Sequence, residues 1–351
     1  MEAGPSEDQD GRPLSRRRRG AVMSDVGRLA GVSHQTVSRV INGSRHVRPE
    51  TRQRVLDAMR ELDYRPNSVA RALVTGRSRT LGVVTFDTIL YGPAATLCGI
   101  ERAAHEAGYF IIVASLKALD RVSVGEAVDR LRLHGVDGIL AIAPQEDAAD
   151  ALRSAPAEIP LVAVEAGPPT DVPVVAVDHI VGATLATRHL LDLGHRTVWH
   201  VAGPRGWLEA QRRLEGWEST LTAAGAPRPE PLFGDWSAQS GYELGRSLSR
   251  NGEVTAIFAA NDQMALGVLR AMHERGRGIP REVSIVGFDD IPEAAFFSPP
   301  LTTVRQDFDE LGTRGVRLLL RSMSVGRRLA ADADVHPALI VRSSTGASVP
   351  G

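Results

Sequence analysis

Residues 25–42, DVGRLAGVSHQTVSRVIN, constrain the fold of this chain more than any other stretch. Two apolar sets recur there at helical spacing and indicate two short helices: Val26, Leu29 and Ala30, then Val37, Val40 and Ile41. Between them, Gly31 can adopt the left-handed conformation that ends a helix. Ser33 is suited to cap the helix that follows. The stretch therefore predicts two helices joined by a tight turn.

The polar face of the second predicted helix favours contact with DNA. It carries His34, Gln35, Ser38, Arg39 and Asn42, and it lacks the Glu and Lys that usually fill a solvated face. Gln and Arg are the side chains that bind adenine and guanine edges bidentately in a major groove. We interpret the stretch as a helix-turn-helix whose recognition helix is 33–42. The alternative from the pattern alone is a helical hairpin with an ordinary polar face.

Charge is unevenly distributed along the 351 residues, although the net charge is only −1. Residues 12–79 hold sixteen Arg and five acidic residues, whereas residues 1–11 and 80–351 are both net acidic. A basic block at one end of an acidic body indicates a polyanionic partner. The chain has a single Lys, Lys117, so part of the Arg content reflects a general preference for Arg over Lys.

The rest of the N-terminal region predicts a small headpiece and a hinge. Pro49 begins a third helix, PETRQRVLDAMREL, and residues 21–65 form the headpiece. Residues 1–20 are polar and predict a disordered tail, with Met23 an alternative start of the chain. Residues 66–79 hold a hinge helix and linker, too short to fold without a partner helix or DNA.

Several classes of protein are excluded by composition. Cys98 is the one cysteine, so no disulfide within the chain and no cysteine-based zinc site is expected, and its helical context predicts burial. No apolar run is long enough to span a membrane, and no apolar segment follows 16–19 as a secretory signal requires. We expect a cytoplasmic protein with no metal and no cofactor.

From residue 80 onward, apolar strand-like runs alternate with helical patterns, which predicts parallel sheets covered on both faces. The number of units favours two such sheets, with a ligand cleft between them or at the carboxyl ends of the strands. The predicted strands are 81–86, 109–114, 138–142, 159–164, 197–201, 256–259, 283–286 and 339–341. The predicted helices include 94–107, 182–193, 206–224, 237–249 and 262–275.

At this point the motifs resemble a known family. DVGRLAGVSHQTVSRVIN and TRQRVLDAMRELDYRPNSVARAL are similar to the headpiece and hinge of LacI/GalR transcriptional repressors. GDWSAQSG, ANDQMALGVLRA, VSIVGFDD and PPLTTVRQDF resemble the galactoside-controlled branch of that family, and the resemblance spans 24–346. It implies an all-α headpiece plus an α/β core of the periplasmic-binding-protein type, with two Rossmann-like parallel-sheet subdomains. The core, 80–346, would divide into 80–177 plus 308–335 and 178–306 plus 336–346.

The resemblance also implies DNA contacts. His34, Gln35 and Arg39 would bind bases, although the galactoside-controlled branch has a tyrosine at the position of His34. Leu73 of paired hinge helices would enter the minor groove and bend the duplex, unless it only packs within the linker. The remaining contacts implied are Ser33, Thr36, Ser38, Asn42, His46, Asn67 and Ala70.

An effector site is implied in the same way. Arg213, Asn261 and Asp289 match hydroxyl-binding positions, with Trp236 and Gln306 beside them and Phe308 and Val164 as apolar walls. Glu165 stands where the related branch has a shorter aspartate, which would shift one hydroxyl contact. An Arg fork, a carboxylate and a Trp face suit a sugar. The residues alone leave structural roles open: Trp236 in a core, Asp289 and Asp290 at a strand end, and Asn261 as a helix cap.

The predicted function is a sequence-specific transcriptional repressor controlled by a sugar, with a galactoside as inducer. A homodimer on a pseudo-palindromic double-stranded operator is expected, because no heptad tail follows the last predicted strand. A different sugar or a corepressor is the alternative within the family. A sugar-binding protein or a glycoside enzyme on an α/β scaffold is the rival class, although no nucleophile-elbow or metal-spaced His motif occurs. His195 and His200 are interpreted as structural.

Overall fold

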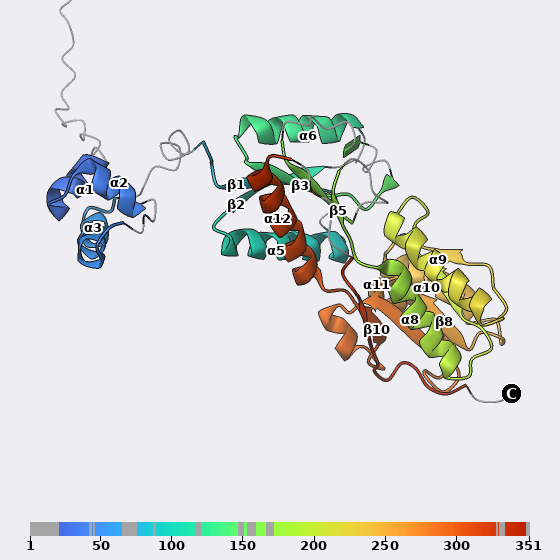
Figure 1. Cartoon of the computed structure of the whole chain (residues 1–351). Coiled ribbons are helices and arrows are strands. Elements are labelled where there is room, and N and C mark those ends of the chain that lie inside the picture. Colours follow the sequence, from blue (N-terminus) through green and yellow to red (C-terminus); the bar gives the residue numbers. More distant parts are fainter. Residues whose placement is uncertain are drawn as a thin grey trace, which may run out of the picture. The chain divides into compact units, whose positions relative to one another are not determined.

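The computed structural model describes residues 21–41, 44, 46–64, 76–86, 89–116, 121–146, 151–152, 159–165, 172–327, 329 and 334–348. The chain divides into two compact units, 1–77 and 78–351 (Figure 1). Among the described residues, no helix combines the length and the hydropathy that crossing a membrane requires.

The described residues of the N-terminal unit form three helices, α1 (Met23–Ala30), α2 (His34–Ile41) and α3 (Pro49–Glu61). Gly31 ends α1 in the left-handed conformation, with φ +64°, as its position predicts. Ser33 caps α2, because its Oγ accepts a hydrogen bond from the backbone N–H of Thr36 at 3.2 Å. The buried core of the unit is Val26, Ala30, Val37, Val40, Val55 and Ala58.

Leu29 does not join this core, and its predicted place in the apolar stripe of α1 is wrong. Its side chain is 46% exposed, whereas Gly27 is buried. The turn after α1 packs closely on Gly27, since a Cβ there would lie 2.9 Å from the carbonyl oxygen of Val32. The buried stripe of α1 is thereby rotated toward Gly27 and away from Leu29.

The C-terminal unit is built on two sheets. The first has the order β2-β1-β3-β4-β5, and all its strands are parallel. Helix α6 covers one face, and α5 and α12 cover the other (Figure 1). Its strands are β1 (Thr80–Phe86), β2 (Phe110–Leu116), β3 (Gly138–Ile142), β4 (Leu161–Val164) and β5 (Val174–Val175). Its helices are α5 (Tyr91–Glu106), α6 (Arg121–Leu133) and α12 (Phe308–Val325).

The second sheet has the order β11-β10-β9-β8-β6-β7, and only the β10–β11 pair is antiparallel. Helices α8 and α9 pack on one face, and α10 and α11 on the other. Its strands are β6 (Trp199–Ala202), β7 (Leu232–Phe233), β8 (Ala256–Ala259), β9 (Ser284–Asp289), β10 (Thr302–Arg305) and β11 (Ala338–Ile340). Its helices are α8 (His179–Asp192), α9 (Leu208–Ala223), α10 (Ala238–Leu248), α11 (Asp262–Glu274) and the 3-10 helix η1 (Pro292–Phe296).

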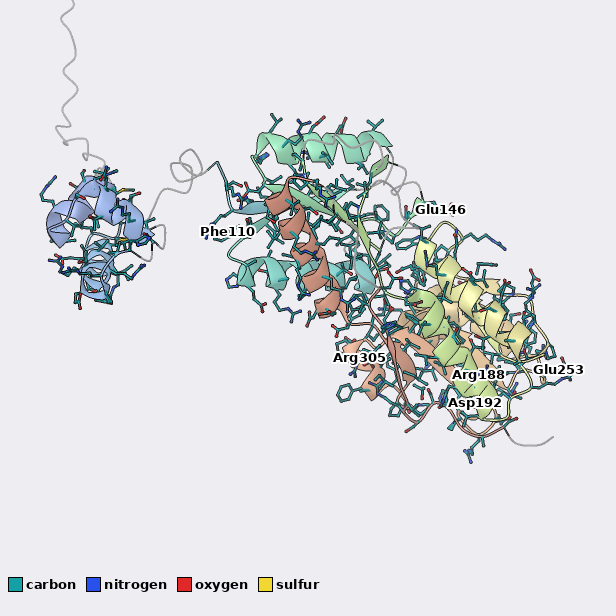
Figure 2. The ribbon with its side chains drawn as sticks, in the orientation of Figure 1. Phe110, Glu146, Arg188, Asp192, Glu253 and Arg305 are labelled. Atoms are coloured by element: carbon teal, nitrogen blue, oxygen red, sulfur yellow. The ribbon has the colours of Figure 1, made fainter. Side chains whose placement is uncertain are left out.

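The chain passes between the two sheets three times. It leaves the first sheet after β5, returns after β10 to form α12, and then enters the second sheet again as β11. A parallel bridge between Val177 and Val335 joins two of these crossovers. A second link comes from Gln211, whose Nε2 donates to Glu146 Oε1 at 2.8 Å (Glu146 is labelled in Figure 2). The crossovers bring the carboxyl ends of both sheets to one cleft.

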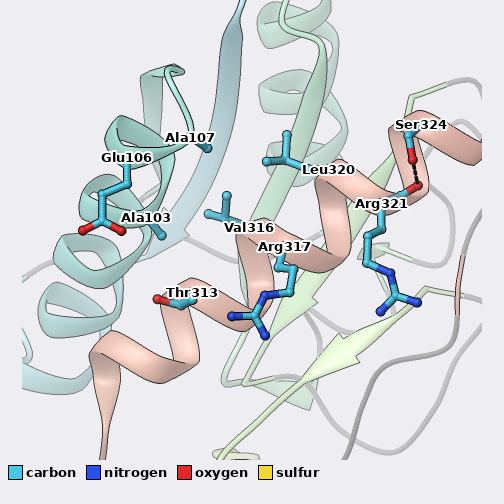
Figure 3. Close-up of a pocket in the computed structure, with 9 residues that line it drawn as sticks. All are labelled: Ala103, Glu106, Ala107, Thr313, Val316, Arg317, Leu320, Arg321 and Ser324. Carbon is cyan, nitrogen blue, oxygen red and sulfur yellow. Dashed lines mark hydrogen bonds between the residues drawn. The ribbon is translucent and has the colours of Figure 1, made fainter.

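Helix α12 is attached to the first sheet by a close crossing with α5. Gly99 and Gly312 face each other there, and a Cβ on either would collide with the backbone of the opposite helix. Farther along, the two helices separate and leave a shallow surface hollow (Figure 3). Cys98, on α5 beside this crossing, is exposed, so its predicted burial is wrong. The glycine contact turns the face of Gly99 inward and Cys98 outward.

Candidate functional site

The exposed face of α2 is the first candidate site. His34, Gln35 and Arg39 are exposed, whereas Val37 and Val40 on the same helix are buried. Three side chains with hydrogen-bonding ends thus project from a helix whose opposite side anchors it to α1 and α3. A helix presented in this way can enter a major groove.

The other predicted DNA contacts fall into two groups. Ser33 is exposed and Thr36 half-buried, and their hydroxyls lie 3.0 Å apart at the start of α2. Ser38 is half-buried, and His46 is exposed in the loop before α3. Predictions for four further residues fall outside the part of the chain that the structure describes: Asn42, Asn67, Ala70 and Leu73.

The second candidate site is a cavity of about 220 Å³ in the cleft of the C-terminal unit. Residues at the start of α5 line one side, and residues from the second sheet and its helices line the other. Five predicted residues meet in its wall: Arg213, Trp236, Asn261, Asp289 and Gln306. The rest of the described lining is Ile89, Leu90, Tyr91, Gly92, Pro93, Trp207, Glu209, Ser237 and Gln263.

Arg213 is the central charged group of this cavity, and protein atoms already occupy much of its guanidinium. Its Nε donates to His179 Nδ1 at 3.3 Å, and its Nη1 donates to the carbonyl oxygen of Ala260. Its Nη2 lies 3.4 Å from Glu209 Oε2 and 3.8 Å from Asp289 Oδ1. Arg213 is therefore a fixed hub, and few of its N–H groups are left for a ligand.

Asp289 ends β9 in an unusual backbone conformation. Its φ is +107°, and its side chain is buried, with Oδ1 accepting from Gln306 Nε2 at 2.6 Å. Burial raises the pKa of Asp289 to about 7, although Arg213 opposes that shift. The next residue, Asp290, has a structural role: its carboxylate bonds Arg305 (labelled in Figure 2) and Arg342, each at 2.6 Å.

Trp236 belongs both to the cavity wall and to a buried apolar cluster. Its six-membered ring packs on Gly203, where any side chain would collide with it. The ring meets Trp207 edge-to-face, with centroids 5.7 Å apart, and the buried Trp236 Nε1 has no hydrogen-bond partner. Asn261 caps α11, because its Oδ1 accepts from the N–H of Met264 at 2.9 Å and its Nδ2 donates to the Trp236 carbonyl at 3.0 Å.

Glu165 does not line the described cavity. It follows β4 with φ +58° and is buried behind Arg213, where its Oε1 accepts from the N–H of Val177 at 3.2 Å. His179 Nδ1 accepts from Arg213, so its Nε2 carries the proton and donates to Glu165 Oε2 at 2.9 Å. Burial raises the pKa of Glu165 to about 7 and lowers the pKa of His179 to about 3. A series of buried hydrogen bonds thus runs from the cavity to a crossover.

This series of buried hydrogen bonds also bears on metal binding. Possible ligand atoms of Glu165, His179 and Glu209 lie within 4.8 Å of one another. The guanidinium of Arg213 bonds both His179 and Glu209, however, and would repel a cation placed between them. The arrangement fits a network of fixed hydrogen bonds and does not suit a metal ion.

Phe308 and Val164 also stand outside the described lining. Phe308 begins α12, and its ring packs edge-to-face on Tyr91 with centroids 5.7 Å apart, so it lies behind a residue of the cavity wall. Val164 is buried in β4. His195 and His200 are held by internal hydrogen bonds and are structural, as interpreted from the sequence.

Reasoning from the sequence missed several residues at the cavity, notably Tyr91, Trp207, Glu209 and the adjacent His179. Glu209 precedes Arg213 by four residues, and this spacing on a helix indicates an ion pair, so the signal was available. Trp207 and Tyr91 gave none, because nothing in the local pattern separates an aromatic residue in a cavity wall from one in a core.

The comparisons with known proteins decide the family. Residues 22–67 match the model of bacterial regulatory proteins of the lacI family, and 187–345 match a periplasmic binding protein-like domain. The lactose operon repressor of Escherichia coli (strain K12) is 35% identical over 326 residues, which cover 92% of this chain and 90% of that protein. The chain belongs to the lacI family.

Other members of the lacI family are similar to the same degree. The transcriptional repressor PurR of Mannheimia succiniciproducens is 33% identical over 330 residues, which cover 92% of this chain and 98% of that protein. A crystal structure of the lac repressor dimer bound to operator and the anti-inducer ONPF superposes with a TM-score of 0.83 and 34% identity, covering 94% of this chain and 100% of that one.

These matches confirm the predicted fold class, a helix-turn-helix headpiece with a two-sheet α/β core. They also confirm the predicted resemblance and make the protein a lacI-family DNA-binding transcriptional repressor. The lactose operon repressor and PurR match almost equally well, so similarity does not identify the effector.

Proposed function

We propose that this lacI-family repressor binds a pseudo-palindromic operator as a homodimer and releases it when a galactoside enters the cavity around Arg213. Each recognition helix would lie in a major groove, with the two grooves about one helical turn apart, ~34–36 Å. In this proposal His34, Gln35 and Arg39 bind base edges, and the other predicted residues bind phosphates and the minor groove. The protein would act in the cytoplasm, where an operator is accessible.

The observation that supports a sugar is the make-up of the cavity wall. Arg213, Asp289 and Gln306 are held in fixed positions by one another, beside the rings of Trp207 and Trp236. Fixed polar groups beside aromatic faces suit a pyranose, whose hydroxyls need hydrogen-bond partners and whose C–H side is apolar. The choice of a galactoside rests on the resemblance of the core motifs to those of the lactose repressor.

Control by a sugar requires different affinities in two states of the protein. A change from 1:99 to 99:1 between the operator-bound and released states needs roughly 10⁴-fold discrimination by the effector. The cavity lies between the start of α5, which packs on the first sheet, and residues of the second sheet and its helices, and the crossovers join the two sheets. A sugar that binds one arrangement of the two sheets more tightly can therefore change how the core positions the hinge.

A second candidate is a corepressor, or a sugar other than a galactoside. It is favoured by the PurR relatives, which match about as well as the lactose repressor. We also propose that the protein turns over no substrate, because the acidic groups of the cavity are bonded to Arg213 and Gln306 and the Ser237 hydroxyl in the lining donates to Asp235.

One experiment separates these possibilities. Sugars are screened by thermal shift on the full chain, and each hit is added to a repressor–operator complex followed by fluorescence anisotropy. Release of the operator by a galactoside supports the proposal, and tighter binding indicates a corepressor. Hydrolysis of the hit during the assay would contradict the absence of enzymatic activity.

A further inference from the structure

The charge balance of the cavity is the feature from which an inference about the effector can be drawn. Among the described lining residues, Arg213 is the one cation, and two carboxylates flank it. Its Nη2 lies 3.4 Å from Glu209 Oε2 and 3.8 Å from Asp289 Oδ1. Its Nε and Nη1 are bonded to His179 and Ala260. The positive charge is thus compensated before any ligand enters.

The hydrogen-bonding capacity left in the wall favours ligands that donate. Gln263 Oε1 is buried without a partner, and the carboxylate of Glu209 can accept further bonds. On the donor side, Trp236 Nε1 is buried and unpartnered, but it is a neutral group. Neutral hydroxyls can satisfy these groups, whereas a phosphate or carboxylate would place acceptors against acceptors.

The two indole rings supply aromatic surface to the wall. Trp207 is 8% exposed and Trp236 5%, and their planes meet at 78°. Two faces nearly at right angles form a corner in which a ring and its neighbouring substituent can both be covered. The corner lies beside Glu209, since Trp207 directly precedes the first turn of α9.

We propose that Glu209 is a specificity-determining residue of the effector site, an inference that rests on the proposed function. It neutralises Arg213 and so restricts the cavity to uncharged, hydroxyl-bearing ligands with apolar ring faces. Phosphorylated and acidic sugars are excluded, because an anion would lose its hydration and meet Glu209, and the described lining offers no free cation to compensate it.

The test compares neutral sugars with their anionic counterparts on the full chain. The pairs are galactose with galactose 6-phosphate and galacturonate, and glucose with glucose 6-phosphate and glucuronate; lactose and cellobiose extend the neutral set. Binding is followed by tryptophan fluorescence, since Trp207 and Trp236 line the cavity. We expect at least one neutral sugar to bind, and its anionic counterparts to bind at least ~10-fold more weakly.

Glu209→Gln keeps the size of the side chain and removes its charge, so Arg213 is left less compensated. The affinity for the anionic sugars, relative to their neutral counterparts, should rise by roughly 10- to 100-fold, as expected for one charge about 6 Å away in a medium of effective dielectric constant ~20–40. Glu215→Gln is the matched control, because Glu215 is exposed on the same helix. It should leave the ratio unchanged. Thermal unfolding of both variants checks that they are folded.

An anionic sugar bound by the wild-type chain as tightly as its neutral counterpart would overturn the inference, as would an unchanged ratio in Glu209→Gln. If the same sugar still releases the operator in either case, the proposed sugar control holds and only the inference about Glu209 fails. If no sugar of either charge binds or affects the operator complex, the sugar-control half of the proposed function fails together with the inference.

Discussion

Replacing His179 by Ala tests the series of buried hydrogen bonds between the cavity and the crossover. His179 is 1% exposed and is bonded on one side by Arg213 and on the other to Glu165. The substitution leaves Arg213 Nε and Glu165 Oε2 buried without these partners. Leaving a buried polar group unpaired costs about 1–3 kcal/mol, and more when the group is charged, so the two losses together should lower the free energy of unfolding by about 3–5 kcal/mol. At about 2–4 °C per kcal/mol for a domain of this size, the unfolding temperature of the core should fall by roughly 6–20 °C.

The assay is differential scanning calorimetry of the full chain, with the transition of the core followed separately from that of the headpiece. His105→Ala is the matched control, because His105 is exposed on α5 and its loss should change little. His179→Gln carries both a donor and an acceptor and should retain part of the stability. A fall of less than 2 °C in His179→Ala, equal to that in His105→Ala, would refute the reasoning.

Three further predictions concern DNA, effector and pH. Arg39→Ala should remove base discrimination and keep most of the salt-dependent nonspecific binding, which a binding-site selection at two salt concentrations checks; an unchanged preferred sequence would count against Arg39 as a base contact. Asp289→Asn tolerates the positive φ and should abolish operator release by the sugar without weakening operator binding; anisotropy titrations that show normal release would place the effector elsewhere. Burial lowers the pKa of His200 to about 4, so between pH 6.5 and 4 the unfolded chain takes up a proton that the folded chain does not. The free energy of unfolding therefore decreases as the pH is lowered through this range. His200→Phe should reduce that fall by about 2 kcal/mol, measured by urea unfolding at pH 7 and pH 4.5; identical pH profiles would contradict the assignment.

Strand positions could be predicted where a run of apolar residues is long and buried on both faces. The strands at 138–142 and 256–259 have the predicted bounds, because every residue in them is buried. The strands β5 and β7 are two residues long and carry too little pattern to be found. The pattern also cannot tell which face of a helix a neighbour packs against, the turn at Gly27 or helix α12 at Gly99, and it therefore places Leu29 and Cys98 in the core.

The cavity shows a similar division. The family resemblance groups Asp289 and Asn261 in one site, and both lie in the cavity wall, where the carboxyl ends of parallel strands meet at one edge of the sheet. Glu165 was grouped with them by its position in the family pattern. Its left-handed backbone and its bond to His179 direct the side chain behind Arg213, and both depend on contacts made across the crossover.

Control of operator affinity by a sugar is tested most directly by one titration. Full-length protein is added to a labelled operator obtained by selection, with random duplex as competitor at physiological salt, in the absence and presence of a saturating neutral galactoside. The account predicts a preference for operator of about 10³-fold or more that largely disappears when the sugar is present. No sequence preference in either condition, or an operator affinity that no sugar changes, would contradict it.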